Sequence, residues 1–348
     1  MKTAILADLH LSDDFGTVKT QVLTWALAAA ERSGAQLLCC IGDLTAQGSD
    51  RQTAEVLRRL TRCAIPCCST PGNAELRLFP GGRNAVRFDL PPPAGIPIVM
   101  IDTAAGEPPP EELAKFVLAR RDEGYRGLNV TVPHKVAVIP LLDHVDDSVS
   151  LYGACNTLRF EQDGTISGFN TDVIGFMDCL ANHGFGIEGK CVIIMGCGGA
   201  GAPLAKSCVL SRASKVLVAA RHEESAIRLR DSLRSVADAG RTEVGIFDVS
   251  DIATARSADL IVNATPVGLK PDDPSILPET AFRPGQFVLD IIPTQHFPPT
   301  AAAARRAGAT AVDGLEFLVG QGAKAFEIWT DIRADRDAML AALRDLRS

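Results

Sequence analysis

The sequence predicts an α/β protein with parallel sheets that are covered by helices on both faces. Short apolar stretches alternate along the chain with stretches of helical period, as in strands joined by crossover helices. The run CVIIMG at 191–196 is apolar throughout, which is typical of a strand buried on both faces. A glycine-rich stretch ends this run, and an apolar helical pattern follows the glycines. These observations indicate strand–turn–helix units of the kind that build such sheets.

The expected elements follow one another along most of the chain. We expect strands, each a short apolar run, at residues 2–8, 35–43, 63–69, 96–102, 127–132, 191–196, 215–221, 259–265 and 287–292. We expect helices at residues 17–33, 51–62, 108–121, 202–212 and 315–346, and directly after Lys135. The helix at 108–121 opens with prolines and acidic residues, which suit the positive end of a helix dipole. In the last helix, a period near 3.6 predicts buried positions at Phe317, Leu318, Phe326 and Trp329.

Length and composition indicate a cytoplasmic protein of two or three domains. The chain has 348 residues, and a domain usually holds about 100–200 residues. Hydrophobic residues make up 46% and charged residues 22% of the chain, which is typical of a folded protein. The net charge of −7 argues against nucleic-acid and polybasic membrane partners, because both modes of binding need a cationic surface.

Neither a membrane span nor a signal peptide is expected. No stretch reaches about 18 consecutive apolar residues, the length that a span requires. The apolar run in the start, MKTAILADLHLS, is broken by Asp8 and is too short for a signal peptide. The ten cysteines are therefore expected to be reduced and mostly buried. Nothing in these features predicts an oligomeric state.

The stretch from Gly196 to Gly201, GCGGAG, predicts a dinucleotide-binding domain of the Rossmann type. It stands between an expected strand and an expected helix, which is the context that separates a nucleotide loop from a plain turn. Gly196 permits the tight turn, Gly198 and Gly199 let the backbone approach a pyrophosphate, and Gly201 lets the helix pack close to the strand. The helix N-terminus adds N–H groups and the positive end of a dipole.

Arg221 favours NADP over NAD as the cofactor. An NAD site places an acidic residue about 20 positions past the glycines, where it holds the ribose 2′-hydroxyl. Here the second strand ends in VLVAARHEES, with Arg221 at that place. A guanidinium can bind a 2′-phosphate through paired charge-assisted hydrogen bonds. Glu223 and Glu224 follow where the next helix is expected to start, and they suit its dipole.

Three polar motifs precede the nucleotide motif. They are NVTVPHK (129–135), GACNT (153–157) and GFNTD (168–172), and each follows a strand-like run, where ligands bind in open α/β sheets. A Lys and an Asp brought together in a cleft can form a proton-transfer pair. Taken singly, Lys135 fits a surface lysine, Asp172 a helix N-cap and Asn156 a turn residue.

Taken together, the motifs resemble one enzyme family. The order NVTVPHK, GACNT, GFNTD, GCGGAG, NATPVG (263–268) and DGLEFLVGQGAKAFEIW (313–329) is similar to that of shikimate dehydrogenase. The resemblance covers about residues 122–348. It implies an NADP-dependent oxidoreductase of aromatic amino acid biosynthesis, which reversibly reduces 3-dehydroshikimate to shikimate. The cofactor would carry the hydride, and the protein would supply geometry and a proton path.

The resemblance also implies roles for single residues. Lys135 and Asp172 correspond to the family's catalytic pair. Lys135 would give a proton to the forming alkoxide, and Asp172 would fix the reacting hydroxyls and the Lys. Substrate contacts would come from Thr131, Asn156 and Gln321. Contacts to NADP would come from Gly196, Gly198, Gly199, Gly201, Arg221 and Thr265.

The sequence departs from the family pattern at three places. The family's early Ser-x-Ser-Pro motif, whose hydroxyls hold the substrate carboxylate, is absent before residue 129. Each such charge-assisted hydrogen bond is worth about 1.5–3 kcal/mol, so carboxylate recognition should be weaker. Pro293 stands where the family has a Tyr, and Ala220-Arg221-His222 replaces the usual Asn-Arg-Thr.

Residues 1–75 resemble instead the start of a calcineurin-type metallophosphoesterase. The candidate metal ligands Asp8, His10, Asp43 and Asn73 each follow an expected strand, as the ligands of that family's two-metal site do. The family's further histidines are missing, and Ala74 stands where it has an acid His. We therefore expect weak or no metal binding and no phosphoesterase activity. A structural βαβ layer, with the Asp residues as turn formers, is as good an interpretation as a residual metal site. Residues 96–120 fit this family's next strand and helix as well as they fit a dehydrogenase.

The predicted architecture is α/β, with a Rossmann-type NADP-binding domain, an α/β substrate-binding domain and an extra N-terminal α/β segment. The expected boundaries are 1–95 for the incomplete phosphoesterase-like segment, 96–185 for the substrate domain with helices 315–348 returning to it, and 186–314 for the NADP-binding domain. A strand from residues 1–101 should cap the edge of the substrate sheet, or that edge is left exposed. The alternatives to a dehydrogenase are a non-catalytic or weakened NADP-binding homologue and a metal-dependent phosphoesterase.

Overall fold

The computed structural model describes two compact units. Unit 1 comprises Met1–Val145, Cys155–Phe169 and Ile328–Asp331, and unit 2 comprises Asp146–Ala154, Asn170–Glu327 and Ile332–Ser348. Within these spans the described residues are 3–7, 23, 27–28, 31–32, 37–41, 58–59, 62, 67–69, 98–100, 112–122, 125–237, 241–270, 272–292, 294 and 297–345. Among the helices described, none is both long and apolar enough to cross a membrane.

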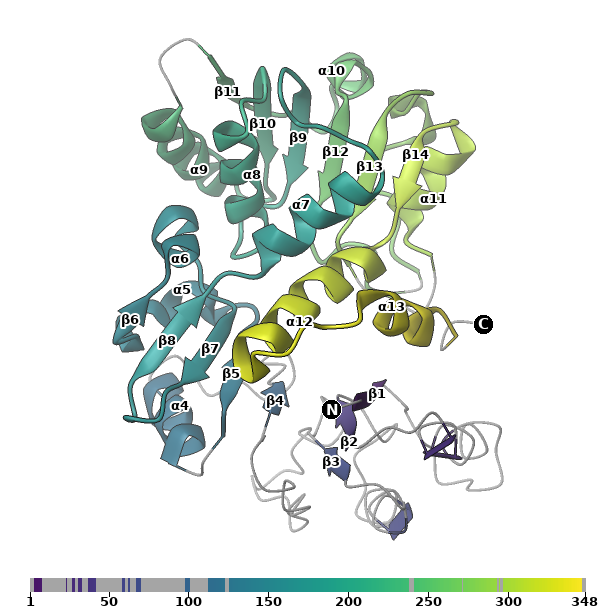
Figure 1. The fold of residues 1–348 in the computed structure, drawn as a ribbon. Coiled ribbons are helices and arrows are strands. Elements are labelled where there is room, and N and C mark those ends of the chain that lie inside the picture. Colours follow the sequence, from purple (N-terminus) through teal and green to yellow (C-terminus); the bar gives the residue numbers. More distant parts are fainter. Residues whose placement is uncertain are drawn as a thin grey trace. The chain divides into compact units, whose positions relative to one another are not determined.

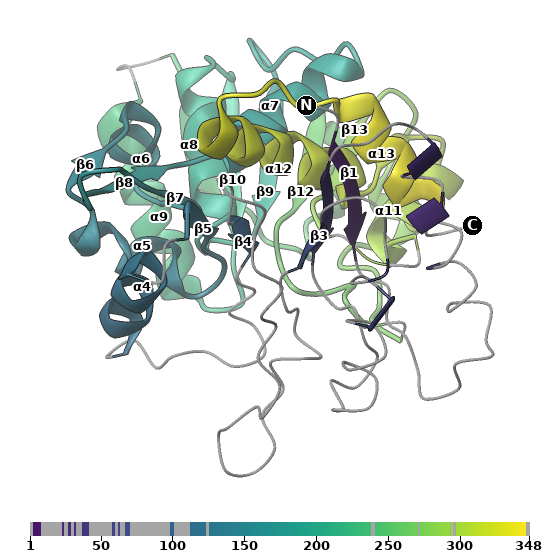
Figure 2. The same cartoon turned by 60° about the horizontal axis from the view of Figure 1, so that its bottom comes forward.

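Unit 1 begins with a small parallel sheet. Its order is β1 (Thr3–Ala7), β2 (Leu37–Ile41) and β3 (Cys67–Ser69), seen as short purple arrows in Figure 2. Both strand pairs are parallel, with Thr3 opposite Leu37 and Leu38 opposite Cys67. The three strands fall within the runs expected at 2–8, 35–43 and 63–69.

The second sheet of unit 1 has five strands in the order β4-β5-β7-β8-β6. The elements of this part are β4 (Ile98–Met100), α4 (Leu113–Asp122), β5 (Gly127–Asn129), α5 (His134–Ala137), the 3₁₀ helix η1 (Ile139–Leu141), β6 (His144–Val145), β7 (Thr157–Phe160) and β8 (Ile166–Phe169). β4 pairs with β5 in parallel at one edge. It is the strand from residues 1–101 that was expected to cap this sheet.

This sheet is mixed, so the expectation of purely parallel sheets was wrong for it. β7 pairs antiparallel with both β5 and β8. The cause is a tight turn between β7 and β8, in which Asp163 accepts hydrogen bonds from the Thr165 N–H and hydroxyl at 3.0 and 2.7 Å. Gly164 takes a left-handed φ of +85° in this turn. A short turn of this kind can join only antiparallel strands.

Unit 2 is built around a six-stranded parallel sheet in the order β11-β10-β9-β12-β13-β14 (Figure 1). Its strands are β9 (Cys191–Met195), β10 (Lys215–Ala219), β11 (Glu243–Ile246), β12 (Leu260–Asn263), β13 (Phe287–Asp290) and β14 (Thr310–Val312). Numbered in chain order, these strands run 3-2-1-4-5-6, the order of the Rossmann fold. The predicted fold class is thereby confirmed for this part of the chain.

The helices that follow or precede these strands are α6 (Asp147–Tyr152), α7 (Asp172–Asn182), α8 (Gly201–Leu210), α9 (Glu223–Val236), α10 (Ile252–Ser257), the 3₁₀ helix η2 (Glu279–Ala281), α11 (Pro299–Arg306), α12 (Gly314–Thr330) and α13 (Arg336–Asp345). Several of them cover the two faces of the sheet. Alternate residues of each strand point to opposite faces. Val192 and Ile194 of β9 pack with α7, α8 and α9, whereas Ile193 and Met195 pack with α10 and α11. The central strands therefore carry continuous apolar runs.

The C-terminal region forms two helices, α12 and α13, where the sequence predicted one helical stretch. The end of α12 groups with unit 1, through Ile328–Asp331. There the Trp329 indole N–H donates to the Leu158 carbonyl at 2.7 Å, and the Arg126 guanidinium donates to the Trp329 carbonyl at 3.0 Å. Trp329 is buried, as its helical spacing predicted.

Candidate active site

The glycine-rich turn follows β9 at the point where the strand order of the sheet reverses. Gly196 has a φ of +115°, and a Cβ there would lie 2.4 Å from the Ala264 carbonyl oxygen. A Cβ on Gly201 would lie 1.9 Å from the Gly196 carbonyl oxygen, so α8 starts in close contact with the turn. Around Gly198 there is open space within 4 Å, and Gly199 beside it is half-buried. Two packed glycines beside an open stretch of backbone fit a turn that receives a pyrophosphate.

A second turn, residues 264–268, follows β12 and lies against the first. β12 pairs directly with β9, with Asn263 opposite Met195. The Ala264 N–H donates to the Met195 carbonyl at 2.7 Å. Thr265, a predicted NADP contact, is half-buried in this turn. The two turns therefore stand side by side at the carboxyl ends of the two central strands, where nucleotides bind in this fold.

Arg221 is exposed just past the end of β10. His222 is the N-cap of α9, and Glu223 and Glu224 occupy the first turn of that helix, as the sequence predicted. The strand pairs with β9 on the side opposite to β12. Arg221 thus belongs to the same edge of the sheet as the glycine turn.

In unit 1, two of the polar motifs meet at one end of the strands of the five-stranded sheet, which we call the motif edge of this sheet. The antiparallel register puts Asn129, at the end of β5, opposite Thr157, at the start of β7. Asn156 precedes β7, so the expectation that this motif follows a strand was wrong. An antiparallel strand begins where its neighbour ends, and the motif reaches the same edge for that reason. Thr131, two residues past β5, is half-buried at this edge.

Backbone bonds fasten these motifs together. The Val130 N–H donates to the Asn156 carbonyl at 2.7 Å, and the Cys155 N–H donates to the Lys135 carbonyl at 2.7 Å. Lys135 lies in α5 and is 8% exposed, and Asn156 is 3% exposed. A long cationic side chain is seldom buried unless its charge is paired.

In unit 2, Asp172 and Gln321 belong to two helices that cross with their backbones in contact. Asp172 is the first residue of α7, and its neighbour Thr171 is the N-cap. A Cβ on Gly175 would lie 2.7 Å from the Gln321 backbone nitrogen, and one on Gly320 would lie 2.8 Å from the Gly175 Cα. Asp172 precedes Gly175 by three residues, about 4.5 Å along the helix axis. The crossing therefore brings the predicted catalytic acid and the predicted substrate amide into one region.

The predicted residues thus form two groups, each within one unit. Thr131, Lys135 and Asn156 belong to unit 1, whereas Asp172, Gln321 and the nucleotide residues belong to unit 2. The candidate metal ligands Asp8, His10, Asp43 and Asn73 lie outside the described residues, and so does Pro293.

Sequence reasoning missed the asparagines that hold these motifs in place. The Asn129 amide donates to the Asn156 carbonyl and to the Thr157 hydroxyl, both at 3.1 Å. The Asn170 amide donates to the Ala154 carbonyl at 2.8 Å and accepts from the Val173 N–H at 3.2 Å. Their only sequence signal was their position inside the quoted motifs.

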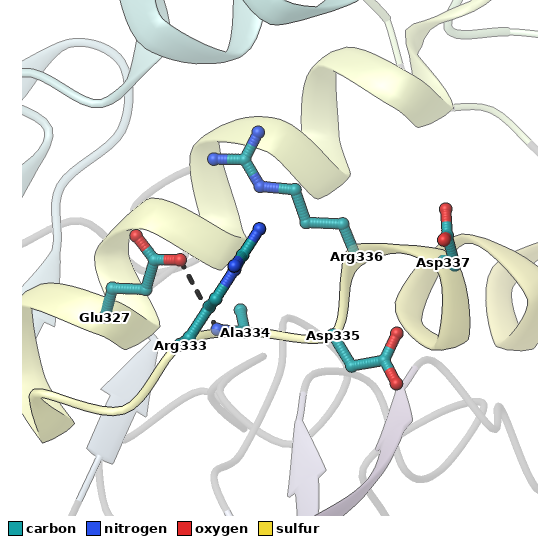
Figure 3. A pocket seen from close by; sticks show the side chains of 6 residues that line it. All are labelled: Glu327, Arg333, Ala334, Asp335, Arg336 and Asp337. Carbon is teal, nitrogen blue, oxygen red and sulfur yellow. Dashed lines mark hydrogen bonds between the residues drawn. The ribbon is translucent and has the colours of Figure 1, made fainter.

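A pocket of about 670 Å³ lies at the turn between α12 and α13. It is lined by Glu327, Arg333, Ala334, Asp335, Arg336 and Asp337, and Figure 3 shows Glu327 turned toward the backbone of Ala334. The Glu327 carboxylate accepts the Ala334 N–H at 3.3 Å. None of the six residues is a predicted site residue. The hydrogen bond in this pocket therefore stabilises the turn between α12 and α13 and involves no residue of the candidate site.

Comparison with known proteins assigns the family. The family model described as the shikimate dehydrogenase substrate binding domain matches residues 99–158. The model described as the shikimate 5'-dehydrogenase C-terminal domain matches residues 314–344. A shikimate dehydrogenase (NADP(+)) of Rubrobacter xylanophilus is 39% identical over 240 residues, which are 68% of this chain and 82% of that protein. The chain belongs to the shikimate dehydrogenase family.

Membership in the shikimate dehydrogenase family also decides between two interpretations of residues 96–120. The first match begins at residue 99, and β4 pairs with β5 of the five-stranded sheet. This strand is therefore part of the substrate domain and not of a phosphoesterase.

Two solved structures illustrate the range of the family's relatives. The shikimate 5-dehydrogenase of Listeria monocytogenes in complex with shikimate and NAD is 30% identical, with a TM-score of 0.60, over 67% of this chain and 82% of that one. A ligand-free 5-ketofructose reductase of a Gluconobacter strain is 27% identical, with a TM-score of 0.59, over 69% of this chain and 86% of that one. Both relatives are oxidoreductases by name, which favours a dehydrogenase over a phosphoesterase.

Proposed function

We propose that the protein catalyses the reversible NADP-dependent reduction of 3-dehydroshikimate to shikimate. One observation carries this proposal. In a chain 39% identical to an enzyme named for this activity, the motifs around Lys135 and Asn156 are bonded to each other at one edge of the substrate sheet. The small-molecule substrate and the NADP cofactor both follow from that likeness.

In the proposed reaction, Lys135 transfers the proton and Asp172 orients the reacting groups. When bound, NADPH supplies the hydride that reduces the ketone. The Lys135 ammonium donates a proton to the oxygen that becomes the new hydroxyl, and in the reverse direction the amine takes it back. Asp172 orients the reacting hydroxyls. Thr131, Asn156 and Gln321 hold the remaining hydroxyls of the ring and set the ketone against the nicotinamide.

The nucleotide residues hold the cofactor. The backbone of Gly196, Gly198, Gly199 and Gly201 and the N-terminus of α8 receive the pyrophosphate. Arg221 receives the 2′-phosphate, which a guanidinium can bind through two parallel hydrogen bonds.

The test is NADP⁺ reduction by shikimate, followed by the absorbance of NADPH. We expect Lys135→Ala and Asp172→Ala to lower kcat by at least about 100-fold, the usual contribution of a proton-transfer group. Lys115→Ala, which removes an exposed Lys of α4, is the matched control and should keep full activity. Failure of the purified protein to oxidise shikimate at any pH from about 7 to about 10 would falsify the proposal.

A polyhydroxy ketone without a carboxylate is the second candidate substrate. Two observations favour it: the chain lacks the Ser-x-Ser-Pro motif before residue 129, and it is 27% identical to a 5-ketofructose reductase. NADPH oxidation with 5-ketofructose, measured beside 3-dehydroshikimate and quinate oxidation, distinguishes the candidates through the ratio of their kcat/KM values.

The domain boundaries at residues 95 and 185 and the cytoplasmic location are part of the same proposal. The family match from residue 99 supports the first boundary. Free thiols are found at Cys179, Cys191, Cys197 and Cys208, as in proteins of a reducing compartment.

A further inference from the structure

A buried Asn–Asp pair lies beneath the turn that carries Thr265. Asn263 ends β12 and Asp290 ends β13, and the parallel register puts the two residues opposite each other. Both are 0% exposed. The Asn263 amide donates to one carboxylate oxygen of Asp290 at 2.9 Å, and the Ile292 N–H donates to the other at 3.2 Å.

The other contacts of the Asn263 amide all go to the turn. Its oxygen accepts from the Thr265 N–H at 2.9 Å and from the Thr265 hydroxyl at 2.8 Å. Its nitrogen also donates to the Val267 carbonyl at 3.0 Å. With the bond to Asp290, both amide hydrogens and both lone pairs are used. The orientation of this amide therefore fixes the conformation of the turn.

The 264–268 turn also contacts the glycine-rich turn at residues 196–201, called the glycine loop below. Besides the clash with the Ala264 carbonyl, a Cβ on Gly196 would lie 3.2 Å from the Thr265 nitrogen, and one on Gly201 would lie 3.3 Å from the Ala264 Cβ. At such distances the turn cannot shift without moving the loop that fits a pyrophosphate.

Burial of a carboxyl group at position 290 costs free energy of desolvation. Its presence there therefore needs an explanation other than packing. Burial raises the pKa of Asp290 to about 6, although the bonds from Asn263 and Ile292 lower it in part and the charge of Asp313 raises it further. An Asn of the same size would present an NH₂ group to one of the two donors. Only a carboxyl group accepts on both sides.

We propose that Asp290 is a positioning residue, which acts through Asn263 to hold the 264–268 turn and the glycine loop in the conformation that binds NADP. The inference rests on the proposed function in one respect, namely that the nucleotide is NADP. Asp290 itself touches no predicted ligand group, so its effect on binding is transmitted by the Asn263 amide.

The experiment is calorimetric titration of the full chain with NADP⁺ and, separately, with shikimate. We expect Asp290→Asn to raise the Kd for NADP⁺ about tenfold and to leave the Kd for shikimate within twofold of wild type. Asp259→Asn is the matched control and should leave the Kd for NADP⁺ unchanged. Asp259 accepts a backbone N–H from Cys191 at 2.9 Å, but it lies at the opposite end of β12.

A purely structural role predicts a different result. In that case Asp290→Asn would lower Tm without changing the Kd for NADP⁺, and this outcome overturns the inference. If Asp290→Asn does not fold, Asn263→Ser tests the same link, because a Ser hydroxyl can still accept from Thr265 but cannot reach Asp290. Wild-type protein that binds NADP⁺ but does not oxidise shikimate would contradict the proposed function and still allow this test.

Discussion

At the scale of single residues, three asparagines hold the polar motifs in place through their side-chain amides. Asn129 bonds the NVTVPHK motif to GACNT, Asn170 bonds GFNTD to the residue before Cys155, and Asn263 bonds β12 to its own turn. Asn129 and Asn170 each donate to a backbone carbonyl of another segment, whereas Asn263 bonds the turn that follows it. An amide carries no charge and gives no periodicity, so the sequence marks such residues only through the motif around them.

The stability of the protein should fall as pH rises through the titration of Asp290. Its pKa is raised from 3.8 to about 6 in the folded protein, so the folded state binds this proton more tightly than the unfolded state. The free energy of unfolding therefore decreases between about pH 4 and about pH 6, by up to roughly 3 kcal/mol from this group. Asp290→Asn should lack this part of the decrease. Urea unfolding of both proteins at pH 4.5 and 7.5 measures it, and parallel pH dependences would contradict the assignment.

At the scale of elements, the central strands were predicted from the sequence and the β7–β8 hairpin was missed. β9, β10, β12 and β13 are apolar on both faces, so composition alone marks them. β7 and β8 carry the polar Thr157, Arg159 and Ser167 and therefore lack that signal. The Asp163-Gly164 dipeptide between them is a turn signal that indicates antiparallel pairing. Reading it would have given the mixed sheet and the correct place of Asn156.

The crossing of α7 and α12 should not tolerate a side chain at Gly175. A Cβ there meets backbone atoms of Phe317 and Gln321, both at 2.7 Å, and backbone cannot rotate away. We expect Gly175→Ala to destabilise the protein by about 1–3 kcal/mol. For a chain of this size the loss lowers Tm by about 1–4 °C. Because Asp172 and Gln321 belong to this crossing, kcat should fall as well.

Gly186→Ala is the control for this substitution, since its Cβ would meet nothing within 4 Å. Thermal unfolding and shikimate oxidation of both variants are compared with wild type. Equal Tm values for the two variants would contradict the prediction, because α7 and α12 would then move apart at no cost in stability.

At the scale of the whole molecule, the family motifs divide the chain unevenly. The curated relative matches 68% of this chain, and the first family model begins only at residue 99. The strands β1, β2 and β3 bond to one another, and among the described residues they share no ladder with the five-stranded sheet. Sequence patterns predicted the dehydrogenase resemblance over about residues 122–348, because the family's motifs all lie there.

Removal of residues 1–95 should leave NADP binding intact. All six strands of the six-stranded sheet come from residues 191–312. The hydrogen bonds of the two turns that we propose to bind the cofactor also lie, among the described residues, within that range. A chain that begins at residue 96 also keeps β4, the edge strand of the substrate sheet. We therefore expect its Kd for NADP⁺ to lie within twofold of the full chain. Calorimetric titration of both proteins, with circular dichroism to verify folding, measures the difference. A tenfold weaker Kd, about 1.4 kcal/mol, would mean that the N-terminal segment contributes to the nucleotide site.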